Sequence, residues 1–300
     1  MSIILNDKNG NYLLEDCLLH KYENVLSYNY YLCSSQLILQ LSSSEENVES
    51  NKEIYYVFDC PVQDPFAHWI YESFIFYPLM LKIQSIYPDV KILTKNTKKY
   101  VKNMFKFFNI NNEIVNEIKN PNNICFFSPI VSLNDLDYLT DLYVKYIHLY
   151  IDNLNFLLSN NISFNNKYLL LPRNSKDNYI GNERTIHGLN DIEDNIISIG
   201  GVVLNTYQIN NIELQMSITK NSEIIILDYG SSFFFNCLNV KDKTIIVLNN
   251  YAYFSNQIKF NSLKIMYDII IKNNKVIFID NLHKNSLEVK FDDIKKFLEL

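Results

Sequence analysis

Short apolar runs alternate with longer segments of helical periodicity along this chain, and this alternation limits its fold more than any other feature. Ile54–Phe58 is typical of a buried strand, and residues 64–86 carry aromatic side chains three and four positions apart, as an amphipathic helix does. The same succession recurs after residue 166. Apolar strands that alternate with helices predict a largely parallel sheet with both faces covered.

The first half of the chain is expected to contain three strands and three helices. Pro78 lies inside the first helix and should kink or split it, because proline has no N–H to donate and its ring collides with the preceding turn. The further strands are expected at residues 90–93 and 124–127, and the further helices at residues 98–108 and 136–158.

The polar segment Ser159–Asn166 is the best candidate for a domain boundary, so we expect domains at residues 1–160 and 161–300. Two sheets, one in each half, predict a two-lobed α/β protein with a cleft between the lobes. Whether the last helix packs back on the first lobe is left open. The second half is expected to hold strands at residues 168–171, 201–204, 223–227, 244–248 and 276–279, and helices at residues 188–197, 212–219 and 291–300.

Composition excludes several classes of protein. The net charge of -6, with lysines scattered rather than gathered into one stripe, argues against a nucleic-acid partner. The 5 cysteines are odd in number and form no CxxC pair, so neither a zinc knuckle nor a disulfide framework is indicated. No transmembrane segment and no signal peptide are recognisable, so a cytoplasmic protein is expected. Assembly into a homo-oligomer is left open.

Arginine is almost absent, although the basic residues number 27. The abundance of Asn, Ile, Lys and Tyr is the bias of an AT-rich genome, as in some large DNA viruses and low-GC bacteria, and it favours lysine over arginine. Arg173 and Arg184 nevertheless stand close together. Their planar forks suit a phosphate or carboxylate, which lysine cannot match. The alternative is two arginines that stand in a solvated loop by chance.

A glycine-serine turn closes the apolar strand expected at residues 223–227. Gly230 permits a sharp turn and a close approach by a ligand. A serine can cap the apolar helix that follows, and the free amides at the start of that helix form an anion site. The alternative is a glycine that only turns the chain, as in many α/β folds. The turn reads Asp228-Tyr229-Gly230-Ser231-Ser232.

His68 and Glu72 are four residues apart near the start of the helix at residues 64–86, so they share one face. They can hydrogen-bond, with one residue orienting the other as a general base. The alternative is a surface ion pair on an amphipathic helix. No metal site is expected, because the sequence Asp135-Leu136-Asp137 is typical of the start of a helix, where acids suit the dipole.

Three of these segments form an ordered pattern. His68 is followed by an aromatic residue and then by the acid Glu72. The strand at residues 168–171 leads to Arg173, and Arg184 follows. Gln215 lies fifteen residues before Gly230. In this order and spacing the chain resembles glycosyltransferase family 61, over roughly residues 55–250. That family includes plant xylan-decorating enzymes and the O-GlcNAc transferase of extracellular domains.

The resemblance implies a GT-B-like architecture of two Rossmann-like lobes. It also implies an inverting, metal-independent transfer of a sugar from a nucleotide sugar, by default a UDP-sugar, to a hydroxyl of a glycan or protein. Glu72, on the N-terminal acceptor-side lobe, would deprotonate that hydroxyl, with His68 orienting it. The C-terminal lobe would bind the donor through Arg173, Arg184, Gln215, Tyr229, Gly230, Ser231 and Ser232.

The chain departs from the family pattern around the glycine-serine turn. Leu214 stands in place of a Glu, Tyr229 in place of a His, and Ser231-Ser232 in place of Ala-Gly. Two further readings therefore stay open. One is a noncatalytic relative that binds a nucleotide or carbohydrate, and the other is a different GT-B sugar-nucleotide enzyme that shares only the architecture. The sequence does not identify the sugar, the nucleotide base or the acceptor.

Overall fold

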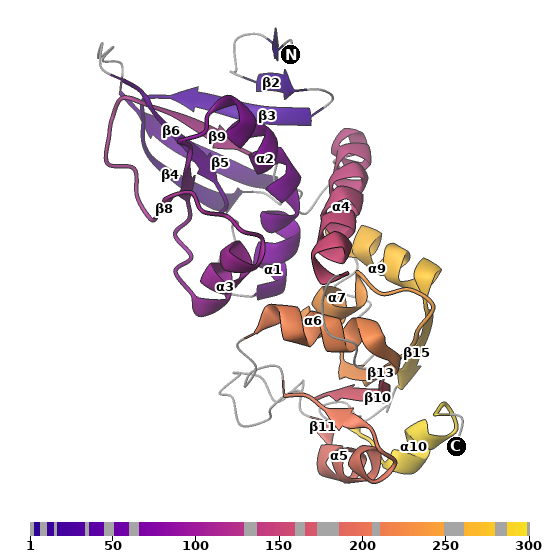
Figure 1. Cartoon of the computed structure of the whole chain (residues 1–300). Coiled ribbons are helices and arrows are strands. Elements are labelled where there is room, and N and C mark those ends of the chain that lie inside the picture. The colour runs from indigo at the N-terminus through magenta and orange to yellow at the C-terminus, as the bar shows by residue number, and fades with distance from the viewer. Residues whose placement is uncertain are drawn as a thin grey trace. The chain divides into compact units, whose positions relative to one another are not determined.

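The computed structural model of the chain divides into two compact units (Figure 1). The first comprises Met1–Asn153 with Phe260–Ser262, and the second comprises Leu154–Lys259 with Leu263–Leu300. The division falls inside a long helix, ahead of the polar segment at which the sequence placed the boundary. The described residues are 3–6, 11–14, 17–33, 36–44, 51–59, 66–128, 137–159, 166–172, 186–205, 211–248, 261–279 and 287–298.

The first unit contains a seven-stranded sheet in the order β1-β2-β3-β9-β6-β7-β8. The half formed by β9, β6, β7 and β8 is parallel, and β1, β2 and β3 extend it with antiparallel pairs. Numbered along the chain, the parallel strands follow the order 3-2-1-4 of a Rossmann-type sheet. The strands are β1 (Ile3–Asn6), β2 (Asn11–Leu14), β3 (Cys17–Glu23), β6 (Glu53–Val57), β7 (Lys91–Leu93), β8 (Ile114–Val115) and β9 (Asn123–Phe127).

Helices cover one face of this sheet, and the proline splits the first of them as expected. Pro78 lies in the first turn of a new helix, where its missing N–H has no partner to lose. The predicted helices at residues 98–108 and 136–158 are also present. The elements are α1 (Phe66–Glu72), the 3₁₀ turn η1 (Phe74–Phe76), α2 (Tyr77–Ile86), α3 (Lys99–Phe107) and α4 (Asp137–Leu158).

Aromatic side chains fill the space between these helices and the sheet. Phe74 is fully buried and contacts the rings of Trp69, Phe105 and Tyr150, which come from α1, α3 and α4. The Tyr143 hydroxyl on α4 also donates to the carbonyl of Tyr71 at 3.1 Å. Large rigid rings bury much apolar area for little loss of rotamer entropy, so this cluster holds α1 firmly against its neighbours.

A hairpin of β4 (Val25–Cys33) and β5 (Gln36–Ser43) covers the other face of the first sheet. It is fastened to β9 by Asn123, whose side chain is fully buried. The Asn123 amide accepts from the Val25 N–H at 3.0 Å and donates to the Val25 carbonyl at 2.8 Å, as a strand neighbour would. This hairpin was not predicted from the sequence.

The second unit is built on a wholly parallel sheet in the order β12-β10-β13-β14-β15. Counted along the chain this is the doubly wound order 2-1-3-4-5, whose topological switch point lies between β10 and β13. All five strands coincide with predicted ones. They are β10 (Asn166–Leu171), β12 (Val202–Val203), β13 (Ser222–Asp228), β14 (Thr244–Leu248) and β15 (Lys275–Ile279).

Helices lie on both faces of the second sheet (Figure 1). One face carries α5 (Leu189–Ser198) and α10 (Phe291–Lys295), and the other carries α6 (Ile212–Asn221), α7 (Ser231–Cys237) and α9 (Asn261–Asn273). The protein is thus α/β, with two mostly parallel sheets. No helix within the described ranges is long and apolar enough to cross a membrane.

The last helix packs within its own unit. Phe291 and Ile294 of α10 belong to the core of the second sheet. The Tyr168 hydroxyl on β10 donates to the Leu298 carbonyl at 2.9 Å. The nearby pair of β11 (Ile186–His187) and β16 (Leu287–Glu288) ties the same C-terminal segment to the chain ahead of α5.

Replacing Asn123 by alanine is expected to lower the unfolding free energy of the first unit by about 3 kcal/mol, because two buried groups of Val25 lose their partners. Urea unfolding followed by the fluorescence of Trp69, the single tryptophan, reports on this unit alone. The exposed Asn116, replaced by alanine, is the matched control and should change stability by less than about 0.5 kcal/mol. An equally small effect at Asn123 would contradict the assigned role.

Candidate functional site

The sole tryptophan fixes α1 to the carboxyl end of β6. Trp69 is fully buried, and its Nε1 donates to the Phe58 carbonyl at 3.0 Å. Phe58 itself continues the pairing with β7, since its N–H donates to the Leu93 carbonyl at 2.9 Å. Because β6 is the first strand of a 3-2-1-4 arrangement, α1 is packed beside the topological switch point of the first sheet, where open α/β sheets bind ligands.

His68 and Glu72 form a hydrogen-bonded pair on this helix. His68 Nδ1 lies 2.7 Å from Glu72 Oε1. The side chain of Glu72 is only 8% exposed, whereas that of His68 is 24% exposed. The pair is therefore not the solvated surface ion pair that the sequence left open. A carboxylate buried this deeply requires strong partners, and the imidazole is one of them.

The geometry of the pair sets the tautomer of the histidine. When Glu72 is ionised its carboxylate can only accept, so Nδ1 then carries the hydrogen and donates to Glu72. A neutral imidazole held in this way presents Nε2 as an acceptor. Among the described residues none hydrogen-bonds to Nε2, and the ring of His68 packs against that of Tyr71 at 5.0 Å between centroids. The arrangement can therefore take up a proton at Nε2.

A second polar cluster lies at the same edge of the sheet and was missed by the sequence analysis. Asp59 follows β6 and is 3% exposed. It accepts hydrogen bonds from Tyr28, from the Thr94 hydroxyl at 3.0 Å and from the Lys95 N–H at 2.8 Å. Burial raises the pKa of this carboxyl against the opposing effect of its donors. The cluster joins the ends of β6 and β7 to the β4–β5 hairpin. The sequence signal that could have identified this cluster is an acidic residue directly after an apolar strand.

In the second unit, the glycine-serine turn follows β13 as predicted. Gly230 has a φ of 143°, a conformation that side chains with a Cβ rarely adopt. Beyond the glycine and its two chain neighbours, no described atom lies within 4 Å of where its Cβ would stand, so the described residues leave this backbone open to a close approach. Ser231 and Ser232 begin α7 and are partly exposed. Tyr229, in contrast, is buried at 4% and packs against the rings of Phe233 and Phe234.

Gln215 lies one layer behind this turn. Its side chain is buried and donates to Asn236 Oδ1 at 2.9 Å. The Asn236 amide in turn donates to the carbonyl of Ser232 at 2.9 Å and to its hydroxyl at 3.0 Å. Thr219 supports the group by donating to the Gln215 carbonyl. Gln215 and the turn are thus brought together through Asn236.

The two arginines lie outside the described residues. Strand β10 ends at Leu171, which is paired with Leu227 of β13, and the chain is described as far as Pro172. The segment that leads to Arg173 and the segment that leads to Gly230 therefore leave neighbouring strands at the same edge. These two strands flank the switch point of the second sheet.

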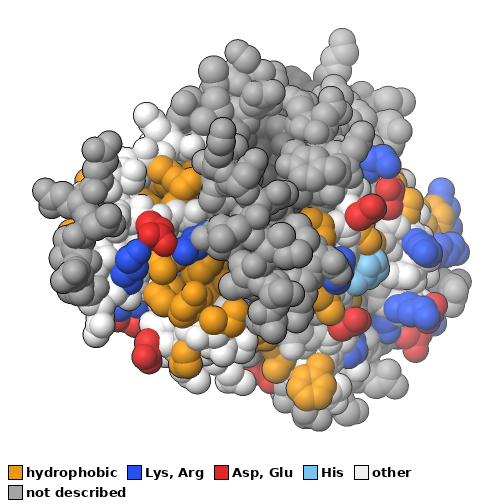
Figure 2. Space-filling view, turned by 90° about the horizontal axis from the view of Figure 1, so that it is seen from above, with side chains coloured by type: hydrophobic (Ala, Val, Ile, Leu, Met, Phe, Trp, Pro, Cys, Tyr) orange, Lys and Arg blue, Asp and Glu red, His pale blue; other side chains and the backbone are white. Residues whose placement is uncertain are grey.

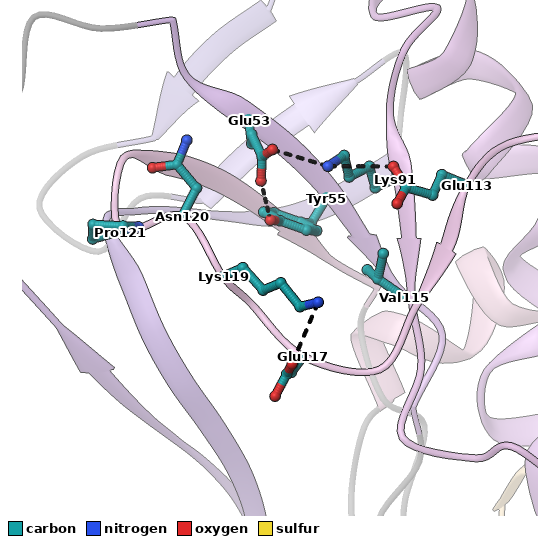
Figure 3. Close-up of a pocket in the computed structure, with 9 residues that line it drawn as sticks. All are labelled: Glu53, Tyr55, Lys91, Glu113, Val115, Glu117, Lys119, Asn120 and Pro121. Atoms are coloured by element: carbon teal, nitrogen blue, oxygen red, sulfur yellow. Dashed lines mark hydrogen bonds and ion pairs between the residues drawn. The ribbon is translucent and has the colours of Figure 1, made fainter.

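A cavity of about 310 Å³ opens at the opposite end of β6 and contains none of the predicted site residues (Figure 3). Its charged side chains pair with one another within the wall. Lys91 bridges Glu53 at 2.9 Å and Glu113 at 3.3 Å, and the Tyr55 hydroxyl donates to Glu53. This network fastens the amino ends of neighbouring strands. The lining residues are Glu53, Tyr55, Lys91, Glu113, Val115, Glu117, Lys119, Asn120 and Pro121.

Comparison of the chain with protein-family models and with curated proteins finds no match. Within the described ranges, no group of three or more His, Cys, Asp or Glu side chains is arranged to hold a metal ion. The Asp135-Leu136-Asp137 sequence falls partly outside those ranges, and α4 begins at Asp137. The interpretation of the site therefore follows from its geometry and from the two switch points.

Replacing Glu53 by glutamine should lower the unfolding free energy of the first unit by about 1 kcal/mol near neutral pH. The hydrogen bond from Tyr55, followed by that from Lys91, lowers the pKa of Glu53 in the folded state. Its ionised form therefore stabilises the fold above the unfolded pKa, and this contribution is lost as the pH falls through the folded pKa.

The difference between the wild type and Glu53→Gln should consequently shrink as the pH falls through the folded pKa of Glu53. Urea unfolding followed by Trp69 fluorescence at several pH values measures it. Glu117→Gln is the control, because that side chain is 65% exposed and lies 3.7 Å from its lysine partner. A difference that stayed constant with pH would contradict the assignment.

Proposed function

We propose that this protein is an inverting glycosyltransferase that moves a sugar from a nucleotide-sugar donor to a hydroxyl of a glycan or protein. One observation carries the proposal. The segments predicted to bind the donor follow β10 and β13, the two strands that flank the switch point of the second sheet. Nucleotide ligands of doubly wound sheets bind at such points. The resemblance to glycosyltransferase family 61 supports the same assignment.

The donor diphosphate is assigned to the second unit. Arg173 and Arg184 would supply planar, permanently charged forks, and the backbone at Gly230 to Ser232 would supply amide donors. Gln215 would act from behind, by holding the turn through Asn236. Tyr229 would shape the turn by packing. Arginine and backbone amides can stabilise the charge that develops on a leaving diphosphate, so the proposed transfer needs no metal or other cofactor.

The general base is assigned to the pair on α1. The resemblance gave this role to Glu72, with His68 orienting it. The exposures favour the reverse division, in which the more accessible His68 takes the proton at Nε2 and the buried Glu72 holds the ring. In the proposed step the acceptor oxygen forms a bond to the anomeric carbon as its proton passes to the base. The bond from that carbon to the diphosphate breaks, and the nucleoside diphosphate leaves with the electron pair.

The remaining features of the proposal follow from the sequence. A UDP-sugar is the default donor, and the acceptor is a soluble, lipid-linked or viral glycan, or a protein. We propose a cytoplasmic location and no nucleic-acid partner. A noncatalytic binding relative is the main alternative, because Tyr229 and the two serines depart from the family motif. The second alternative is another sugar-nucleotide enzyme of the same architecture. The two experiments below separate these cases.

A thermal-shift panel of UDP-, GDP-, CMP- and dTDP-sugars should show stabilisation by one nucleotide class. A ligand present at one hundred times its dissociation constant stabilises by about 2.7 kcal/mol, which is an easily measured shift. Arg173→Ala should remove the shift, and Lys167→Ala, an exposed lysine on β10, should keep it. If no nucleotide stabilises the protein, the proposal is wrong.

Replacing His68 by glutamine should reduce sugar transfer by roughly 100-fold or more while leaving nucleotide binding intact. Glu72→Gln should have a smaller effect if it only orients the ring. Release of nucleoside diphosphate, measured with the donor that the panel identifies, gives the rates. His148→Gln, an exposed histidine on α4, is the matched control. Donor binding with no transfer by the wild type over a panel of acceptors would favour the noncatalytic alternative.

A further inference from the structure

Helix α3 presents a single row of lysines to solvent. No acidic residue occurs between Asp89 and Glu113, a stretch that contains six lysines. Within it, Lys99, Lys102 and Lys106 lie on one side of α3 and are exposed, whereas Val101, Met104 and Phe105 on the other side are buried. At 3.6 residues per turn these three lysines fall within an arc of about 60°. We call them the lysine face.

The expectation that the lysines form no stripe is therefore wrong for this helix. On the face of the molecule seen in Figure 2, described lysines stand beside acidic side chains at several places. The lysine face differs, because Lys99, Lys102 and Lys106 form no ion pair with any described residue. Its charge is thus unpaired within the part of the chain that the structure describes.

The stability of α3 does not account for this arrangement. Lys98 and Lys99 stand at the amino end of the helix, where the macrodipole disfavours cations. Lys102 lies four residues from Lys98 and from Lys106 and three from Lys99, and like charges at these spacings repel. Only Lys106 suits its position, in the last turn. An anionic partner would relieve the repulsion that the isolated helix carries.

We propose that the lysine face docks the protein on the surface of an anionic phospholipid bilayer. Residues within a narrow arc of one helix can all touch a flat surface at once, and mobile lipid headgroups gather beneath them without a fixed pattern. Lysine suits this role as a compact charge, whereas recognition of fixed phosphates favours the arginine fork. The proposal goes beyond the proposed transferase activity and does not depend on it.

Nucleic acid fits this face less well. A helix in the groove of a duplex needs phosphate contacts on both of its flanks, and the charges of α3 lie in one row. Single strands require exposed aromatic rings on which bases stack, whereas Phe105 of α3 is buried and Tyr100 and Phe107 are only partly exposed. The surface of an anionic bilayer requires only a row of basic side chains.

Co-sedimentation with vesicles tests the proposal. The full chain should sediment with vesicles of phosphatidylcholine and phosphatidylserine at low ionic strength, and not with phosphatidylcholine alone. Binding should vanish near 1 M salt, where the screening length is about 3 Å. The variant Lys99→Gln/Lys102→Gln/Lys106→Gln should bind roughly 100-fold more weakly, since each lysine near the surface contributes about one factor of five.

The control variant is Lys241→Gln/Lys272→Gln/Lys275→Gln, which removes the same charge from exposed positions of the second unit. It should bind as the wild type does. The α3 variant should unfold at the same temperature as the wild type or higher, because repulsion is removed, so misfolding can be told from lost docking. Failure of the wild type to bind, or equal losses in both variants, would overturn the proposal. Binding to duplex DNA but not to vesicles would overturn it in favour of a nucleic-acid surface.

Discussion

Parallel pairing between β10 and β13 is the constraint on which the rest of the site depends. Leu171 and Leu227 are partners in this ladder, so the segments that follow them emerge side by side although they are 56 positions apart in the chain. The neighbours β12 and β14 continue the sheet in opposite directions, so the connections that follow β10 and β13 lead to opposite sides of the point between these two strands. A turn with an open backbone at Gly230 stands at that point. Any ligand of the second unit is expected there.

The first unit also has a switch point at one edge of its sheet, but the residues that stand there are of a different chemical type. Its strand order also creates a switch point, and the helix packed there carries a buried carboxylate rather than an open turn. Burial explains why Glu72 is better suited to hold a histidine than to meet a substrate. Removing a carboxylate from water is expensive, and a donor such as His68 offsets part of that penalty. The imidazole is less buried, so in the proposed transfer it is the member of the pair that would meet the acceptor.

The sequence predicted the parallel strands and most helices because apolar runs and three-to-four spacings record burial directly. It did not predict the β4–β5 hairpin, whose attachment depends on Asn123, a residue 98 positions from its partner Val25. It predicted Gln215 near the turn, but only the fold shows that Asn236 stands between the two. The lysine face was not predicted because charge was considered over the whole chain. Helical periodicity brings onto one side of α3 lysines that are three and four positions apart in the sequence. A role in the site that depends on how deeply a side chain is buried cannot be predicted from sequence patterns.

The position that departs most from the family motif also has a physical account. Tyr229 is buried among Phe233 and Phe234, so its ring has become part of the packing that supports α7. A side chain engaged in this way does not reach a ligand with its ring, and donor recognition at the turn would pass to the backbone of Gly230 and Ser231. Such recognition tolerates side-chain changes, because amide donors depend on φ and ψ rather than on residue identity. Gly230 would then be the residue of this turn that substitution affects most, since its φ of 143° excludes side chains with a Cβ.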